Sequence, residues 1–274
     1  TDAQTVNIVT TNAGTDTAVG SLALDAADTN TLTVTGSSTA GDTIATGNIT
    51  GSDEVTSVTA TSSATGSTNT VGTIADADGL TSITLTAEQA DASIGQVGTD
   101  ATANNAELLS SVTVSSSGTG ITATMGAIFA DSTVDSATDL AMTVSATSGS
   151  GSTTAMGAID NTYGSITGTY ATSGTTTQAT LTAAAMTLTK TGSGGATFDA
   201  LVGSGAVTLT ASGTGATTVT DANVDGGSAS LTVVGTDMSG VLNVNATNTS
   251  ADSTLTGGSG ADILEGGSGD DTFR

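Results

Sequence analysis

The 274-residue sequence contains no cysteine, histidine, proline or tryptophan, and aromatic residues make up only 2% of it. The absence of cysteine excludes disulfides and thiolate zinc sites, and the absence of histidine excludes Ser-His-Asp and Cys-His catalysis. The metal ligands that remain are the oxygen atoms of carboxylates, hydroxyls and backbone carbonyls. A ligand set made only of oxygen favours calcium or magnesium.

Positive charge is almost absent as well. The sequence has 26 acidic residues against two basic ones, Lys190 and Arg274, which gives a formal net charge of −24. Two basic groups cannot neutralise many phosphates, so nucleic acid and anionic membrane surfaces are not expected as partners. Cations are the expected counter-species, because a charge of this size opposes a compact fold unless ions screen or bridge it. No apolar run approaches the ~20 residues of a transmembrane helix, and no signal peptide is predicted.

The sequence does contain many short runs in which apolar residues alternate with threonine or serine. This period of two is typical of half-buried β-strands, and β-branched threonine suits a pleated surface. A hydrophobic fraction of 36% and a mean hydropathy of +0.16 argue against a disordered tract. The sequence therefore predicts an all-β chain. The predicted strands include 32–36, 57–61, 82–86, 111–118, 141–149, 186–192, 207–213 and 230–235.

The predicted strands recur with a loose period of about 25 residues, which indicates a repeat architecture. The first apolar residues of comparable runs are Ile8, Leu32, Val58, Ile83, Val112, Met142, Ile166, Met186, Val207, Leu231 and Leu255. A unit of this length cannot bury its own apolar face, whereas stacked units can. We therefore predict a parallel β-solenoid (β-helix), with a chain of β-sandwich modules as the alternative. Local helical character is limited to 85–94 and 104–111.

Residues 257–274 consist of one nine-residue phrase written twice, GGSGADILE and GGSGDDTFR. The glycines allow tight turns that direct carbonyl oxygens inward, and the aspartate adds a charged oxygen. The phrase follows the G-G-x-G-x-D-x-U-x pattern of calcium-binding β-helices. The predicted metal-binding residues are Gly257, Gly258, Gly260, Asp262, Gly266, Gly267, Gly269, Asp270 and Asp271.

Two such nonapeptides are expected to form one turn of a solenoid, with calcium bound between the loops of successive turns. Each loop then supplies half of a site, and the other half lies about 18 residues away. The preceding segment NTSADSTLT, 248–256, is a degenerate relative in which Asp252 is out of phase.

The two nonapeptides resemble those of the RTX (repeats-in-toxin) family, whose members Gram-negative bacteria secrete through type I export. The acidic body, which lacks cysteine and is rich in threonine, glycine and serine, also resembles the solenoid regions of RTX-type bacterial surface-layer (S-layer) proteins. The resemblance implies a β-solenoid over 1–254 and the start of an RTX β-roll over 255–274. It also implies export without a cleaved N-terminal signal, calcium-dependent folding outside the cell and lateral self-assembly.

The resemblance implies a structural building block of a calcium-stabilised S-layer at the bacterial cell surface. Its expected partners are copies of itself, calcium ions and cell-surface polysaccharide. The alternative is an RTX adhesin that binds a glycan, a host surface or ice. No enzyme is expected, because the sequence offers no nucleophile–base pairing, and RTX proteases require an H-E-x-x-H motif that a chain without histidine cannot form.

Two further patterns are weaker. Asp76 and Asp78 resemble the start of an EF-hand loop, but Glu88 falls one place late for its twelfth position, and a solvated turn is the simpler interpretation. The many T-x-T runs could order water and bind ice if they kept one phase on successive turns. The drifting spacing of the runs instead favours threonine as a strand former.

Overall fold

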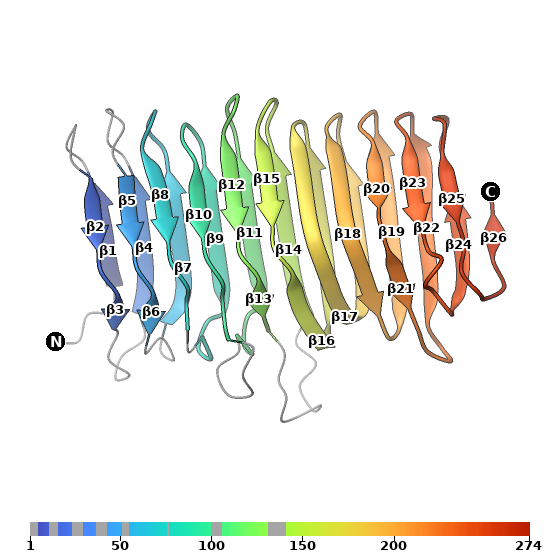
Figure 1. Cartoon of the computed structure of the whole chain (residues 1–274), viewed down its shortest axis with the longest axis horizontal. Coiled ribbons are helices and arrows are strands. Elements are labelled where there is room, and N and C mark those ends of the chain that lie inside the picture. Colours follow the sequence, from blue (N-terminus) through green and yellow to red (C-terminus); the bar gives the residue numbers. More distant parts are fainter. Residues whose placement is uncertain are drawn as a thin grey trace.

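The chain folds as a parallel β-solenoid, which confirms the predicted fold class. Strands of successive turns lie side by side along the long axis, from β1 at one end to β26 at the other (Figure 1). The strand pairings are parallel. The structure, a computed structural model, describes residues 5–10, 16–23, 30–36, 43–50, 55–75, 77–99, 106–130 and 141–274.

The strands form three ladders that run along the solenoid. Ladder A contains β1 (Thr5–Thr10), β4 (Asn30–Gly36), β7 (Val55–Ser62), β9 (Ser82–Ala87), β11 (Ser111–Ser116), β14 (Ala141–Ser148), the second half of β16 (Ile159–Thr172), the end of β17 (Thr175–Thr191), β19 (Ala206–Gly213), β22 (Ser230–Met238), β24 (Asp252–Thr256) and β26 (Thr272–Phe273).

Ladder B contains β2 (Thr17–Val19), β5 (Thr43–Thr46), β8 (Thr68–Val71), β10 (Ala92–Ile94), β12 (Thr122–Met125), β15 (Thr153–Met156), the start of β17, the start of β18 (Gly195–Gly203), β20 (Thr217–Val219), β23 (Leu242–Asn245) and β25 (Ile263–Glu265). The shorter ladder C contains β3 (Leu22–Ala23), β6 (Ile49–Thr50), single bridges at Ile74 and Val97, β13 (Ile128–Phe129), parts of β16, β17 and β18, and β21 (Ala222–Val224). Figure 1 shows ladder A behind ladder B.

The register confirms much of the predicted repeat and corrects part of it. Leu32 pairs with Val58, Val58 with Ile83, and Ile83 with Val112, as predicted. Three predicted pairings were wrong by two residues: Ile8 pairs with Val34 instead of Leu32, Val112 with Val144 instead of Met142, and Leu255 with Val233 instead of Leu231. Met142 pairs with Ile166 as predicted. The connecting loops differ in length from turn to turn, so spacing along the sequence does not fix the pairing.

The interior is a narrow apolar stack built from alternate residues of each strand. In β4, Leu32 and Val34 are buried, whereas Thr31, Thr33 and Thr35 are half-exposed. The same alternation recurs along ladder A. Because successive side chains of a strand point to opposite faces, the apolar set of each turn stacks on that of the next.

Two aromatic rings widen the apolar stack in the middle of the solenoid. Tyr170 and Phe198 are fully buried and meet edge to face, with ring centroids 4.8 Å apart and ring planes at 80°. Gly168 makes room for them, because a Cβ at that position would overlap the Tyr170 ring and the Leu188 side chain. The Tyr170 hydroxyl donates a hydrogen bond to Gln178 Oε1 at 3.2 Å, and burial raises the pKa of this phenol above its usual range.

The helical character predicted for 85–94 and 104–111 was wrong. Residues 85–94 contain the end of β9, a bend and β10, and the described part of the second segment is a turn followed by β11. Leu85 and Ala87 in β9, and Ala92 and Ile94 in β10, are buried at a period of two within each strand. Tertiary burial therefore overrides the helical propensity of the Glu, Gln and Ala residues between the two strands. No helix long and apolar enough to cross a membrane occurs in the described part of the chain.

Glycines stack on one another where the chain turns between ladders. At the corner from ladder B to ladder C, Gly126 lies on Gly95 and Gly157 lies on Gly126. At the corner from ladder A to ladder B, a second column runs through Gly174, Gly194, Gly215, Gly240 and Gly260. A Cβ at Gly194 would overlap the carbonyl oxygen of Gly174, so the turns can approach to the β-ladder spacing only without a side chain.

Replacing Gly194 with alanine should therefore destabilise the solenoid, because the added methyl group must push two stacked turns apart. We expect a loss of about 1–3 kcal/mol in the free energy of unfolding, as for other overpacked sites. Thermal or denaturant unfolding measures it. The control is Gly227→Ala, since a Cβ at Gly227 would have no atom within 4 Å. Equal stability of the two variants would show that the glycine column is not required by packing.

Candidate calcium-binding loops

The two glycine-rich nonapeptides form the last turn of the described solenoid. The first loop, 257–262, connects β24 to β25 at the A–B corner, and the second loop, 266–271, connects β25 to β26 at the opposite edge. Leu255 pairs with Phe273, 18 residues further on. The prediction that two nonapeptides make one turn is therefore confirmed.

The first loop is tied to the preceding turn through Asp262. Its Oδ1 accepts a hydrogen bond from the Leu242 amide at 2.8 Å, and its Oδ2 accepts one from the Gly258 amide at 2.7 Å. The Ser259 amide donates to the Met238 carbonyl at 2.9 Å. Asp262 therefore fixes both the shape of its own loop and the contact of that loop with the turn before it.

The second loop repeats this arrangement on the other edge. Asp271 Oδ1 accepts a hydrogen bond from the Ser253 amide at 3.0 Å, across 18 residues. The Ser268 amide donates to the Thr249 carbonyl at 3.0 Å. A second bond joins the same two turns, but here the carboxylate belongs to the earlier turn. The Asp270 amide donates to Asp252 Oδ1 at 2.8 Å. The predicted spacing of about 18 residues between neighbouring loops holds here, and the first loop contacts residues 20 or 21 positions back.

Backbone carbonyls crowd against the loop glycines. A Cβ at Gly258 would overlap the Met238 carbonyl oxygen and lie 2.5 Å from that of Gly235. A Cβ at Gly267 would likewise overlap the Thr249 carbonyl oxygen. Among the described residues, no group of three or more acidic side chains lies close enough to hold a metal ion by itself. An ion at these loops would therefore take most of its ligands from backbone carbonyls.

The carbonyl and carboxylate oxygens of these loops are the kind of ligand that calcium binds. Calcium prefers six to eight hard oxygen ligands and accepts carbonyls and carboxylates together. The residues that would hold it are Asp262 and Asp271, together with the carbonyls of the glycine turns. Bound calcium would supply positive charge between stacked loops that otherwise bring carbonyl and carboxylate oxygens together. The ligand roles of all nine predicted residues, Asp262, Asp270 and Asp271 included, stay predictions.

Comparison with known proteins assigns the same segment. Residues 248–274 match a family described as RTX calcium-binding nonapeptide repeat (4 copies). The C-terminal end of the chain therefore carries RTX repeats. The match begins at 248, so it includes the degenerate segment in which the Asp252 carboxylate binds the next turn instead of its own loop. No curated protein and no solved structure matches the chain.

The RTX match covers less than the last tenth of the sequence. The predicted boundary between a solenoid at 1–254 and an RTX roll at 255–274 stays a prediction, since ladder A continues through β22, β24 and β26 without interruption.

The EF-hand-like segment does not form a comparable site in the described residues. Asp76 lies outside them. Asp78 lies in the turn after the single bridge at Ile74, and Glu88 is exposed just after β9. No helices flank this loop in the described part of the chain, as the sequence indicated.

Carboxylates elsewhere in the solenoid also bridge turns, which the sequence analysis missed. Asp91 Oδ1 accepts a hydrogen bond from the Thr122 amide at 2.8 Å, and Asp16 Oδ1 accepts one from the Thr43 amide at 3.0 Å. Both aspartates directly precede a ladder B strand, and each accepts a hydrogen bond from the first amide of the ladder B strand in the next turn. The signal available in the sequence was an aspartate directly before a short strand.

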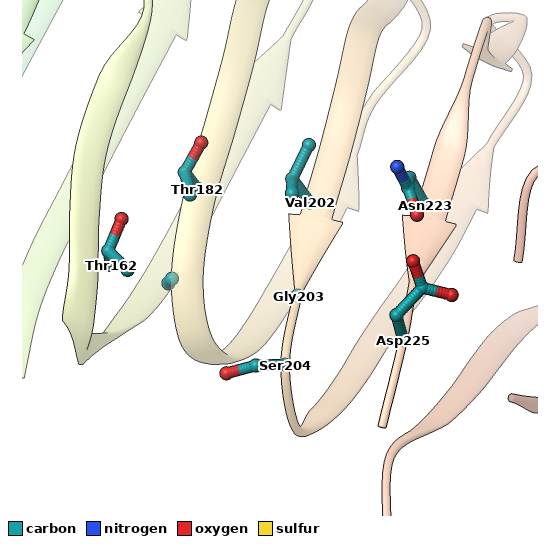
Figure 2. Close-up of a pocket in the computed structure, with 8 residues that line it drawn as sticks. Thr162, Thr182, Val202, Gly203, Ser204, Asn223 and Asp225 are labelled. Carbon is teal, nitrogen blue, oxygen red and sulfur yellow. The ribbon is translucent and has the colours of Figure 1, made fainter. Parts of the chain in front are cut away.

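A shallow hollow of about 220 Å³ lies on ladder C, where Thr162, Thr182, Val202 and Asn223 come from successive turns (Figure 2). Asp225 is the one titratable group among its lining residues. Its Oδ1 accepts hydrogen bonds from the amide and the hydroxyl of Ser250. This hollow offers no nucleophile–base pair, and the non-enzymatic character of the chain stays a proposal.

The sequence analysis also missed the role of Lys190. Its side chain is fully buried inside the solenoid, and its Nζ donates to the Gly215 carbonyl at 3.1 Å and to the Gly192 carbonyl at 3.3 Å. The ammonium thus lies under the stacked A–B corner. The alternation of Met186, Leu188 and Lys190 at a period of two was the signal that this lysine points inward.

Lys190 should make stability depend on pH. Burial lowers the pKa of Lys190 below its ordinary value of 10.5, so between the two values the unfolded chain binds a proton that the folded chain does not. Stability should therefore rise with pH in that window, by at most about 1.4 kcal/mol per pH unit.

The measurement is the difference in unfolding free energy between the parent and Lys190→Met, taken at pH values below 10. The difference cancels the contribution of Tyr170, whose raised pKa acts in the opposite direction above pH 10. If the difference in unfolding free energy between the parent and Lys190→Met does not change with pH, burial does not lower the pKa of Lys190, and this prediction is wrong.

The loop aspartates should couple calcium to stability. In the double variant Asp262→Asn/Asp271→Asn an amide oxygen can still accept one hydrogen bond per loop, but both charges that attract a divalent ion are lost. We expect calcium to raise the melting temperature of the parent and to have little effect on this variant, because only binding to the folded state stabilises it. The control is Asp199→Asn/Glu88→Gln, which removes two exposed charges elsewhere. Equal calcium responses of the two double variants would contradict a role for these loops.

Proposed function

We propose that the chain is a structural building block of an extracellular surface layer that calcium stabilises. The observation that carries this proposal is the unbroken parallel solenoid that ends in RTX loops. Such a rod presents long regular surfaces, and its turns contact only their neighbours, which suits a repeating material. Because each turn repeats the one before it, the rod has long regular sides along which two copies can make lateral contact.

The location that we propose is outside the cell. RTX repeats are typical of proteins exported through type I secretion, and calcium is available to fold the loops once the chain has been exported. The net charge of −24 supports this order of events, since self-repulsion opposes compaction until cations are bound. Cell-surface polysaccharide is the further partner that we propose for anchoring.

An adhesin is the second candidate, because threonines of successive turns lie in register on ladder A, as in the row Thr143, Thr167, Thr187 and Thr208. Regular ranks of threonine on ladder A would suit ice or a glycan as ligand. The surface-layer proposal has the advantage that it also uses the high acidic charge, which calcium can bridge between molecules as well as within them.

The test is electron microscopy of the purified 274-residue chain with calcium and with a chelator. We expect ordered two-dimensional sheets in calcium and their loss on chelation. Single rods under both conditions, together with tight binding to a glycan or to ice, would replace the surface-layer function with the adhesin function.

A further inference from the structure

The outer face of ladder A carries columns of hydroxyl side chains in register. The first column contains a threonine or serine at every described turn. It consists of Thr5, Thr31, Ser57, Ser82, Ser111, Thr143, Thr167, Thr187, Thr208, Thr232, Thr254 and Thr272. The number of residues between successive strands varies, but the strands themselves pair in register. The T-x-T runs of successive turns are therefore aligned in space although their spacing in the sequence is irregular.

Two further columns lie beside the first, two and four residues along each strand. The second consists of Asn7, Thr33, Thr59, Thr84, Thr113, Ser145, Thr169, Thr189, Thr210, Val234 and Thr256. The third consists of Val9, Thr35, Thr61, Thr86, Ser115, Thr147, Ala171 and Thr191. We call these three columns together the threonine face.

The threonine face is exposed or half-exposed and carries no charge. Thr143, Thr167, Thr169 and Thr210 are among its exposed members. One residue in ten of the chain is charged, yet none of the positions in the three columns is. The nearby exposed charges on ladder A are Asp237, past the end of the third column, and Asp252, two residues before Thr254. In a chain of net charge −24, an uncharged face lets two molecules approach without bringing like charges into direct contact.

The spacing of the columns selects the occupant. Rungs of the ladder stand about 4.8 Å apart, and residues two apart on a strand stand about 6.6 Å apart. A periodic array gains most from a partner of the same period. A second copy of this solenoid has that period by construction, so its threonine methyl groups and hydroxyls can interdigitate along the whole length, as in-register side chains do between paired sheets.

The area of the threonine face is sufficient for such a pair. A ladder roughly 50 Å long and about 20 Å wide presents about 1,000 Å². Stable protein–protein interfaces bury about 800 Å² on each partner. A twofold arrangement would place the threonine face of one molecule against that of its partner and form a closed, self-complementary contact.

We propose that the threonine face is the self-association surface of this chain, with a second copy of the chain as its occupant. This inference rests on the proposed surface-layer function and names one of its lateral contacts. The contact would pair solenoids face to face and leave the other sides of the solenoid available for contacts in other directions.

The test compares two double variants that add the same charge on different faces. Thr169→Glu/Thr210→Glu places two carboxylates in the second column of the threonine face, at exposed positions of β16 and β19. The matched control Thr124→Glu/Thr175→Glu places two at exposed positions of ladder B, in β12 and β17. Sedimentation in calcium measures the mass of the full chain, and circular dichroism checks that each variant is folded.

We expect the parent and the control to double in mass or form larger assemblies, and the threonine-face variant to stay at the mass of one chain. If the parent and both variants assemble alike, the threonine face is not the interface, while the surface-layer function stands. If the parent does not assemble at all, the surface-layer function fails and this inference fails with it. If the parent shapes ice crystals and the threonine-face variant does not, the ligand of this face is ice and not a second copy of the chain.

Discussion

The parallel pairing of each turn with the next, in register and at one fixed spacing, is the constraint on which the whole structure depends. It stacks like residues on like, so the apolar interior, the glycine corners and the threonine face all run as columns along the rod. It also dictates glycine where the chain turns, because a Cβ at Gly194 or Gly157 would overlap the backbone of the turn before it. Loops of different length are tolerated because they lie outside the columns.

The same stacking places backbone carbonyl oxygens at the corners, where a positive charge stabilises them. At the described A–B corners from Gly174 to Gly260, the glycines stack closely on backbone carbonyl oxygens of the turn before, and the chain has only two basic residues. Lys190 supplies such a charge within the solenoid, where its ammonium binds the carbonyls of Gly192 and Gly215. Further along the same column, the corner at Gly260 belongs to the first RTX loop, whose chemistry suits a calcium ion. Acidic composition, glycine corners and calcium loops are therefore parts of one electrostatic arrangement.

Much of the fold could be predicted from the sequence, because its signals are local. Alternation with threonine located the strands of ladder A. The MGAI segments 125–128 and 156–159 stack in register, with Met125 paired to Met156 and Ile128 to Ile159. Register could not be predicted from spacing, because Val112 pairs with Val144, 32 residues further on, whereas the average repeat is about 25 residues. The threonine face was missed for the same reason. At the loops, the repeated phrase identified the residues, but the hydrogen bonds that link Asp262 and Asp271 to the preceding turn follow only from the stacking.

The most direct test of calcium-dependent order is amide hydrogen exchange of the full chain, in calcium and in a chelator. Stabilisation by the RTX loops predicts that chelation accelerates exchange most at the amides that Asp262 and Asp271 bind, those of Leu242, Gly258 and Ser253. Amides around Lys190 should change least, because a covalently attached cation already occupies that corner. Exchange that is identical with and without calcium at all of these amides would contradict the central claim.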